Sequence, residues 1–108
     1  MAFQVAEVSI ELVEALAPLM PRIKQHDRSL ADQLLRAANS ISLNCAEAEY
    51  SDPGNRRARL HTAAGSAGET RMALRLAVAW RCVSAREAEC ARALVDRIVA
   101  MLWKMTRG

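Results

Sequence analysis

The chain has 108 residues, a length suited to one domain with a hydrophobic core of its own. Hydrophobic residues make up 52% of the chain but only four residues are aromatic, and this composition, with four Gly and three Pro, favours helices over strands. The formal net charge of +3 is a mild bias that does not by itself indicate nucleic-acid binding.

The cysteines and the chain's hydropathy bear on the cellular compartment. Cys45, Cys82 and Cys90 are odd in number and form no Cys-x-x-Cys pair, so they suggest neither a disulfide framework nor a zinc knuckle. No segment is long and apolar enough to cross a bilayer, and the N-terminus lacks the basic-then-apolar order of a signal peptide. We therefore expect a cytoplasmic protein with no membrane contact.

Two amphipathic helices are predicted in the first half of the chain. The first covers about residues 3–20, is stopped by Pro21, and has apolar residues at helical spacing, namely Val5, Val8, Leu12, Leu16 and Leu19. Ser29 can cap the second helix, which runs from about Leu30 to Glu49. Asp32 lies in its first turn, where the helix dipole favours a carboxylate.

The third predicted helix is the longest, from about Pro53 to Arg81, with Asp52 as its cap. Gly65 and Gly68 lie inside it. A glycine in a helix interior costs about 1 kcal/mol relative to alanine, so we expect another helix to approach the backbone closely at these positions.

The fourth predicted helix begins at Ser84 and Glu87, which have the Ser-x-x-Glu spacing of a capping box, and ends near Thr106. Four helices with short connections predict a single all-α domain over residues 1–108. The simplest packing is an up-down-up-down antiparallel four-helix bundle.

A row of polar side chains runs along the second helix within an arc of about 80°. Its members are Gln33, Arg36, Ser40, Asn44 and Glu47. On the third helix, Thr62, Ser66 and Glu69 share one side with apolar residues, namely Met72, Ala73, Leu76 and Trp80. Two interpretations stay open. The polar row is a solvated face, or it is a polar network inside the bundle or at a subunit contact. In the network, Arg36 pairs with Glu69, and Ser40 and Asn44 bond Ser66 or the backbone.

The segments QLLRAANSISLNCAEAE and LHTAAGSAGETRMALRLA resemble the signature of the four-helix-bundle proteins encoded by intervening sequences in bacterial 23S rRNA genes. The first motif, Gln-x-x-Arg-Ala-x-x-Ser-Ile-x-x-Asn-Ile-Ala-Glu-Gly, is matched at Gln33, Arg36, Ala37, Ser40, Ile41, Asn44, Ala46 and Glu47. The second, Ala-x-Gly-Ser-x-x-Glu, is matched at Ala63, Gly65, Ser66 and Glu69. The chain departs from the first motif at Cys45, usually isoleucine, and Ala48, usually glycine.

This resemblance covers about residues 20–82 and implies a four-helix bundle that assembles into a ring, typically a homopentamer. It also implies a family whose biochemical role is largely unestablished. A related accessory protein of diversity-generating retroelements is similar in fold and associates with a reverse transcriptase and nucleic acid. A nucleic-acid-linked role follows by analogy alone.

Catalytic and metal sites are not indicated. A di-iron bundle needs Glu-x-x-His pairs, which the chain lacks, and His26 and His61 each stand without a Cys or His at ligand spacing. Ser40 and Ser66 have no histidine in step with them, and there is no phosphate-binding glycine loop. We expect no enzymatic activity, no metal, no cofactor and no small-molecule substrate.

Basic residues on the third helix are the candidate nucleic-acid contacts, namely Arg56, Arg57, Arg59, Arg71 and Arg75. In a monomer they would form a solvated face. In a ring the row is repeated by symmetry, and five copies of a chain with net charge +3 carry about +15. That charge is enough to attract the phosphate backbone of RNA or DNA with weak sequence specificity. The near absence of exposed aromatic residues argues against base stacking.

A second apolar stripe on the third helix favours self-association, because a lone bundle cannot easily cover two apolar sides. Its members are Leu60, Ala64, Ala67, Leu74 and Val78. Glu7, Glu11 and Glu14 offer opposite charge to arginines of a neighbouring copy. The sequence therefore predicts a non-enzymatic homo-oligomer that binds nucleic acid or a ribonucleoprotein; the alternative is a protein-interaction or scaffold module without nucleic-acid contact.

Overall fold

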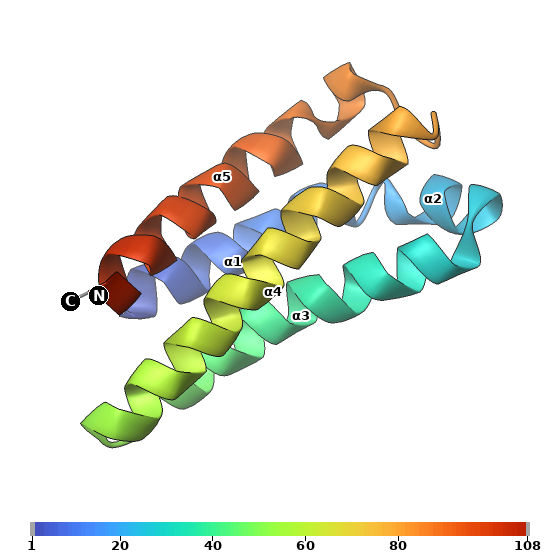
Figure 1. The fold of residues 1–108 in the computed structure, drawn as a ribbon. Coiled ribbons are helices and arrows are strands. Elements are labelled where there is room, and N and C mark those ends of the chain that lie inside the picture. The colour runs from blue at the N-terminus through green and yellow to red at the C-terminus, as the bar shows by residue number, and fades with distance from the viewer. Residues whose placement is uncertain (1, 108) are drawn as a thin grey trace.

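The computed structural model describes residues 2–107, in which helices are joined by short turns and no strand occurs (Figure 1). The helices are α1 (Ala2–Leu16), α2 (Met20–His26), α3 (Arg28–Glu49), α4 (Pro53–Ala79) and α5 (Ala85–Arg107). The all-helical prediction is confirmed, but the described residues form five helices and not the four expected.

The additional helix arises from two prolines, Pro18 and Pro21. The first helix was predicted to reach residue 20, yet α1 ends at Leu16 and the chain turns before α2 begins. Pro21 lies in the first turn of α2, where a helix needs no N–H donor, so this proline starts a helix and does not stop one. The buried Ile23 anchors α2, which packs against α3.

Side-chain caps set the starts of three helices. The N-cap of α3 is Asp27 and not the predicted Ser29, since Asp27 Oδ1 accepts a hydrogen bond from the Leu30 N–H at 3.1 Å. The predicted cap Asp52 is confirmed by a bond of 3.0 Å from the Asn55 N–H. The capping box is also confirmed, with reciprocal bonds of 2.9 and 3.0 Å between Ser84 and Glu87.

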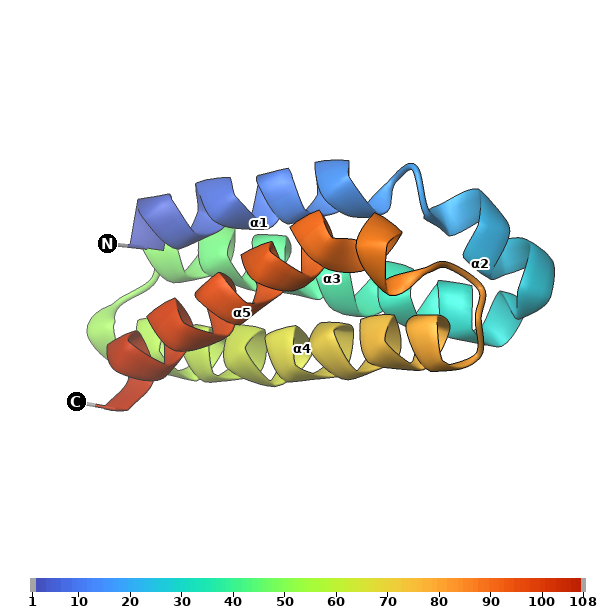
Figure 2. The same ribbon diagram turned by 90° about the horizontal axis from the view of Figure 1, so that it is seen from above.

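Successive long helices run in opposite directions, and the start of α1 lies at the same end of the molecule as the end of α5 (Figure 2). α1 packs against α3 and α5, and α4 packs against the same two helices, so the four long helices enclose one core. Its largest fully buried side chains include Leu12, Ile23, Leu34, Ile41, Ile98 and Leu102. The molecule measures 42 × 22 × 19 Å.

Helix α4 buries one of the two apolar sides that the sequence predicted. Leu60, Ala67 and Leu74, from the second apolar stripe, are buried inside the chain. Met72 and Trp80, expected in a packed face, are 52% and 72% exposed. An added Cβ at Gly65 or Gly68 would meet no atom within 4 Å, so the close helix approach expected at these glycines does not occur within the chain.

Candidate functional site

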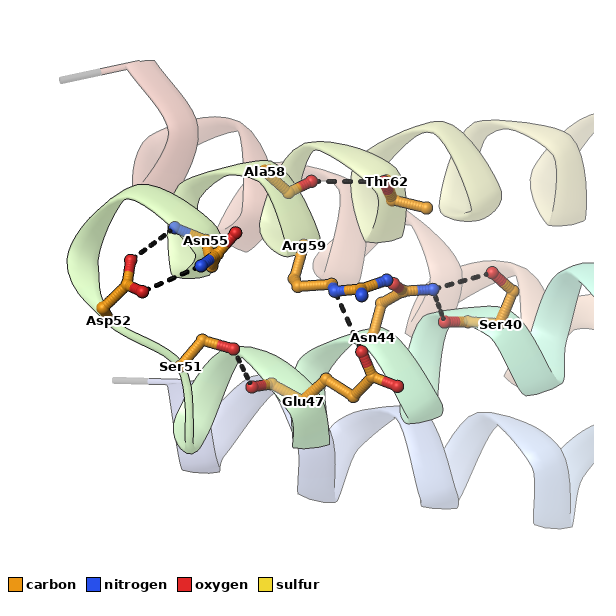
Figure 3. A network of polar contacts seen from close by, with 9 residues as sticks. All are labelled: Ser40, Asn44, Glu47, Ser51, Asp52, Asn55, Ala58, Arg59 and Thr62. Atoms are coloured by element: carbon orange, nitrogen blue, oxygen red, sulfur yellow. Dashed lines mark hydrogen bonds and ion pairs between the residues drawn. The ribbon is translucent and has the colours of Figure 1, made fainter.

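Two members of the polar row, Ser40 and Asn44, meet Ser66 of α4 at the contact between α3 and α4. Ser40 Oγ lies 2.7 Å from Ser66 Oγ across the two helices. Asn44 Nδ2 donates to the Ser40 carbonyl at 2.9 Å and to Ser40 Oγ at 3.1 Å (Figure 3). Ser66 is buried where α3 and α4 pack, and the hydrogen bond with Ser40 Oγ satisfies its hydroxyl. The structure therefore brings Ser40, Asn44 and Ser66 together as a link between helices.

Glu47 makes a second, more exposed link between the same helices. Its Oε2 lies 2.9 Å from Arg59 Nε on α4, and both side chains are about half exposed (Figure 3). Ion pairs in contact with solvent contribute at most about 1 kcal/mol. This pair therefore orients the two helices more than it stabilises them.

The expected pair of Arg36 and Glu69 is not formed. Arg36 Nη2 contacts Asp32 Oδ2 at 2.8 Å, one turn earlier on α3, and the Arg36 side chain is 78% exposed. Glu69 is exposed and has no ion pair among residues 2–107, and Gln33 is exposed as well. A partner four residues away on the same helix needs no helix–helix approach, which is why Asp32 and not Glu69 holds Arg36.

The five candidate arginines separate into two groups. Arg56 donates from Nε to the Ala48 carbonyl at 3.0 Å and so caps the last turn of α3, while Arg59 pairs with Glu47. The remaining three lie toward α5: Arg57 donates to the Thr106 carbonyl at 3.2 Å, and Arg71 lies 3.6 Å from Asp96. The sequence-predicted cluster of five is therefore not one surface.

A hollow of about 400 Å³ between α4 and α5 gathers two of these arginines with a third from α5. It is lined by Gly68, Arg71, Met72, Arg75, Arg92 and Asp96. Arg92 also contacts Glu89 at 2.6 Å and Asp96 at 3.0 Å. Arg75 has no ion pair within the described part of the chain. We call this feature the α4–α5 hollow.

Arg92 was missed because the basic residues were sought on one helix. The sequence does carry a signal for Arg92. Glu89 stands three positions before it and Asp96 four positions after it, spacings that are typical of ion pairs along one side of a helix. Only the packing of α5 on α4 brings that side beside Arg71 and Arg75.

Exposed aromatic side chains correct one of the sequence expectations. Tyr50, Trp80 and Trp103 are 87%, 72% and 57% exposed, so the expectation that few aromatic rings would be exposed is wrong. Tyr50 and Trp80 flank opposite ends of α4, and one face of Trp103 is covered by the Arg107 guanidinium, 4.2 Å from the ring centroid. The three rings therefore do not make one stacking platform.

The thiol and histidine side chains form no reactive cluster in the described region. Burial raises the pKa of the Cys45 thiol to about 11, which keeps it protonated near neutral pH. His26 and His61 are exposed, and within residues 2–107 no three His, Cys, Asp or Glu side chains gather as a metal site. None of the described helices has a stretch apolar and long enough to span a membrane.

Comparison with known proteins identifies the family. The sequence profile described as 23S rRNA-intervening sequence protein matches residues 1–104, which include nearly all of the five helices. The chain belongs to this family. The resemblance seen in the sequence motifs is thereby confirmed and extends well beyond residues 20–82.

One solved relative shares the fold of this 23S rRNA-intervening sequence protein. It is a protein of unknown function from the S23 ribosomal protein family of Bacteroides thetaiotaomicron VPI-5482. The two chains superpose with a TM-score of 0.86 and 21% identity over 96% of this chain and 99% of that one. No protein with a curated description matches the chain.

Proposed function

We propose that this 23S rRNA-intervening sequence protein is a non-enzymatic homo-oligomer that binds the phosphate backbone of RNA or DNA in its α4–α5 hollow. The observation that carries the proposal is the gathering of Arg71, Arg75 and Arg92 around one hollow with a single acidic side chain, Asp96, in its lining. Guanidinium groups suit phosphate because they donate two parallel hydrogen bonds.

Arg71 and Arg75 are available to a phosphate, whereas Arg92 is held by Glu89 at 2.6 Å and by Asp96 at 3.0 Å. Arg71 and Asp96 are each more than 40% exposed and stand 3.6 Å apart, a geometry in which the pair contributes little. Gly68 carries no side chain that would obstruct a strand entering the hollow. Because these contacts reach phosphates and not base edges, binding is expected to be sensitive to salt and nearly independent of sequence.

The test measures binding of fluorescently labelled structured RNA and duplex DNA by anisotropy across a salt series. Arg75→Glu is the first variant, since Arg75 makes no described ion pair and its replacement therefore breaks none. We expect at least a tenfold loss of affinity at low salt, and a salt slope reduced by about 1 per lost phosphate contact.

The matched control is Arg97→Glu, which makes the same change of charge at an exposed arginine of α5 that does not line the hollow. It should lower affinity much less than Arg75→Glu. Equal losses would show that net charge and not the hollow is responsible, and absence of binding by the unmodified protein at low salt would remove the proposal.

We also propose that the four long helices act as an up-down-up-down four-helix bundle that assembles into a homopentameric ring. Supporting this, several large apolar side chains stay exposed in the single chain, among them Leu35 at 49%, Met72 at 52% and Leu76 at 40%. Light scattering after gel filtration should give about five times the chain mass of 11.9 kDa. A monomer at micromolar concentration would contradict this.

The same exposed apolar surface favours the alternative function, a protein-interaction or scaffold module without nucleic-acid contact. This alternative predicts the oligomer but no binding to either nucleic acid in the anisotropy series. Light scattering together with the anisotropy series therefore distinguishes nucleic-acid binding from a scaffold role.

A further inference from the structure

The molecule has an apolar groove that no described residue fills. It lies where the end of α1, α2 and the first half of α3 meet, has a volume of about 860 Å³, and is lined by apolar side chains that include Val13, Met20 and Leu35. Lys24 and Arg28 stand in its lining, and neither makes an ion pair in the described part of the chain. A carboxylate, Asp32, also stands in the lining, but Arg36 holds it at 2.8 Å. We call this feature the α1–α3 groove; it offers apolar surface together with two cations that make no ion pair.

The outer side of α4 offers the complementary features. Spacings of four, three, four and four residues place one row of side chains within about 80° on this helix. The row consists of Gly65, Glu69, Met72, Leu76 and Trp80. Its apolar members are 40% to 72% exposed, its carboxylate makes no ion pair among the described residues, and space at Gly65 is open. We call it the α4 row.

We propose that the α4 row of one copy lies in the α1–α3 groove of a second copy, with Glu69 beside Lys24 and Arg28. This inference rests on the proposed self-assembly and specifies the two surfaces that meet. Both surfaces are apolar. The row carries a carboxylate without an ion pair and the groove carries two such cations, while the groove's own carboxylate, Asp32, is already paired with Arg36. A contact of row against row would instead bury two carboxylates with no cation in either row, at a cost of several kcal/mol.

The two surfaces belong to different parts of the molecule, so one chain can use both at once. The groove is built by α1, α2 and α3, whereas the row is on α4, which packs chiefly on α3 and α5. A contact between unlike surfaces is head-to-tail and closes into a ring when the rotation between copies allows it. Gly65 then has a use, because the missing Cβ lets the neighbouring copy approach the α4 backbone.

The experiment compares Leu76→Asp in the row with Leu35→Asp in the groove, both at exposed positions so that each variant can fold. Each variant alone should drop from the oligomer mass to 11.9 kDa, with its helical content by circular dichroism unchanged. An equimolar mixture should form a 1:1 dimer and nothing larger, because it contains one intact row facing one intact groove. Leu43→Asp, at an exposed leucine outside both surfaces, is the matched control and should keep the full mass.

The charged contact is tested separately. Glu69→Lys should weaken assembly, and combining it with Lys24→Glu and Arg28→Glu should restore it. Full mass in both aspartate variants, or a mixture that stays monomeric, overturns the inference while leaving self-assembly standing. A monomeric unmodified protein overturns both.

Discussion

Ser66 shows how a polar side chain can be placed at a helix contact without leaving a hydrogen-bonding group unsatisfied. Its hydroxyl meets Ser40 Oγ at 2.7 Å, and its carbonyl accepts a hydrogen bond from Thr70 Oγ1 at 2.8 Å. A neutral hydrogen bond contributes only about 1 kcal/mol net, but leaving its partner buried and unpaired costs about 1–3 kcal/mol. The pair therefore selects one register of α3 against α4.

Ser66→Ala should lower the free energy of unfolding by about 1 kcal/mol, because the bond to Ser40 is lost at a buried site. In urea unfolding, a double-mutant cycle with Ser40→Ala should give a coupling of about 0.5–1.5 kcal/mol. Thr62→Ala is the control, since its hydroxyl bonds only the Ala58 carbonyl on its own exposed turn. Strict additivity of the two serine changes would show that no stabilising bond exists.

Arg36 marks the limit of pattern analysis for individual side chains. Its position beside the apolar face of α3 was compatible with a buried pair to Glu69 or with a solvated pair. The spacing to Asp32, four residues earlier on the same helix, is a local signal that predicts the second arrangement. The opposed pair Glu47 and Arg59 has no such signal, because it depends on how closely α4 approaches α3.

At the scale of elements, α4 ends in a strained but well-bonded turn. Arg81 has φ of 63°, in the left-handed region that glycine favours. The Arg81 N–H bonds the Val78 carbonyl at 3.0 Å and the Cys82 N–H bonds the Ala77 carbonyl at 2.9 Å, the pattern of a Schellman motif. Hydrogen bonds thus hold a conformation that the arginine Cβ disfavours.

Arg81→Gly should raise the free energy of unfolding by about 0.5–1 kcal/mol, because relief of left-handed strain exceeds the added chain entropy of glycine. Urea unfolding at fixed protein concentration measures it. Arg81→Ala separates backbone from side-chain effects, since it removes the guanidinium but keeps the Cβ. If alanine stabilised as much as glycine, the strain explanation would be wrong.

The helix starts were predictable where the signal was unique and failed where two signals competed. Asp52 and the Ser84-x-x-Glu87 box are the acceptors that begin α4 and α5. Before α3, both Asp27 and Ser29 are good caps. Asp27 takes the role because α2 ends at His26 and α3 begins at Arg28, which leaves Asp27 as the one residue between the two helices. Pro21 was similarly ambiguous, since proline suits the first turn of a helix as well as the position after one.

At the scale of the whole molecule, carboxylates without ion pairs and the arginines of the α4–α5 hollow belong to different helices. Glu7, Glu11 and Glu14 are exposed on α1 and make no ion pairs among the described residues, while the arginines of the hollow belong to α4 and α5. Such a distribution suits a head-to-tail arrangement of copies, in which unlike charges approach, better than a symmetric pairing of like surfaces. Met72 belongs both to the α4 row and to the lining of the α4–α5 hollow, so the two proposed contacts adjoin on α4.

The sequence alone determined the helical nature of the chain, two of its caps and its family, because these depend on neighbours within one or two turns and on motif spacing. It did not determine which of two apolar stripes on α4 is buried, since hydrophobic burial depends on which helices surround α4 and not on α4 itself. Tertiary structure decided that Leu60, Ala67 and Leu74 face the core. As a result, Met72, Leu76 and Trp80 face outward. The packing of α5 on α4 also brings Arg92 beside Arg71 and Arg75, which no pattern within one helix could predict.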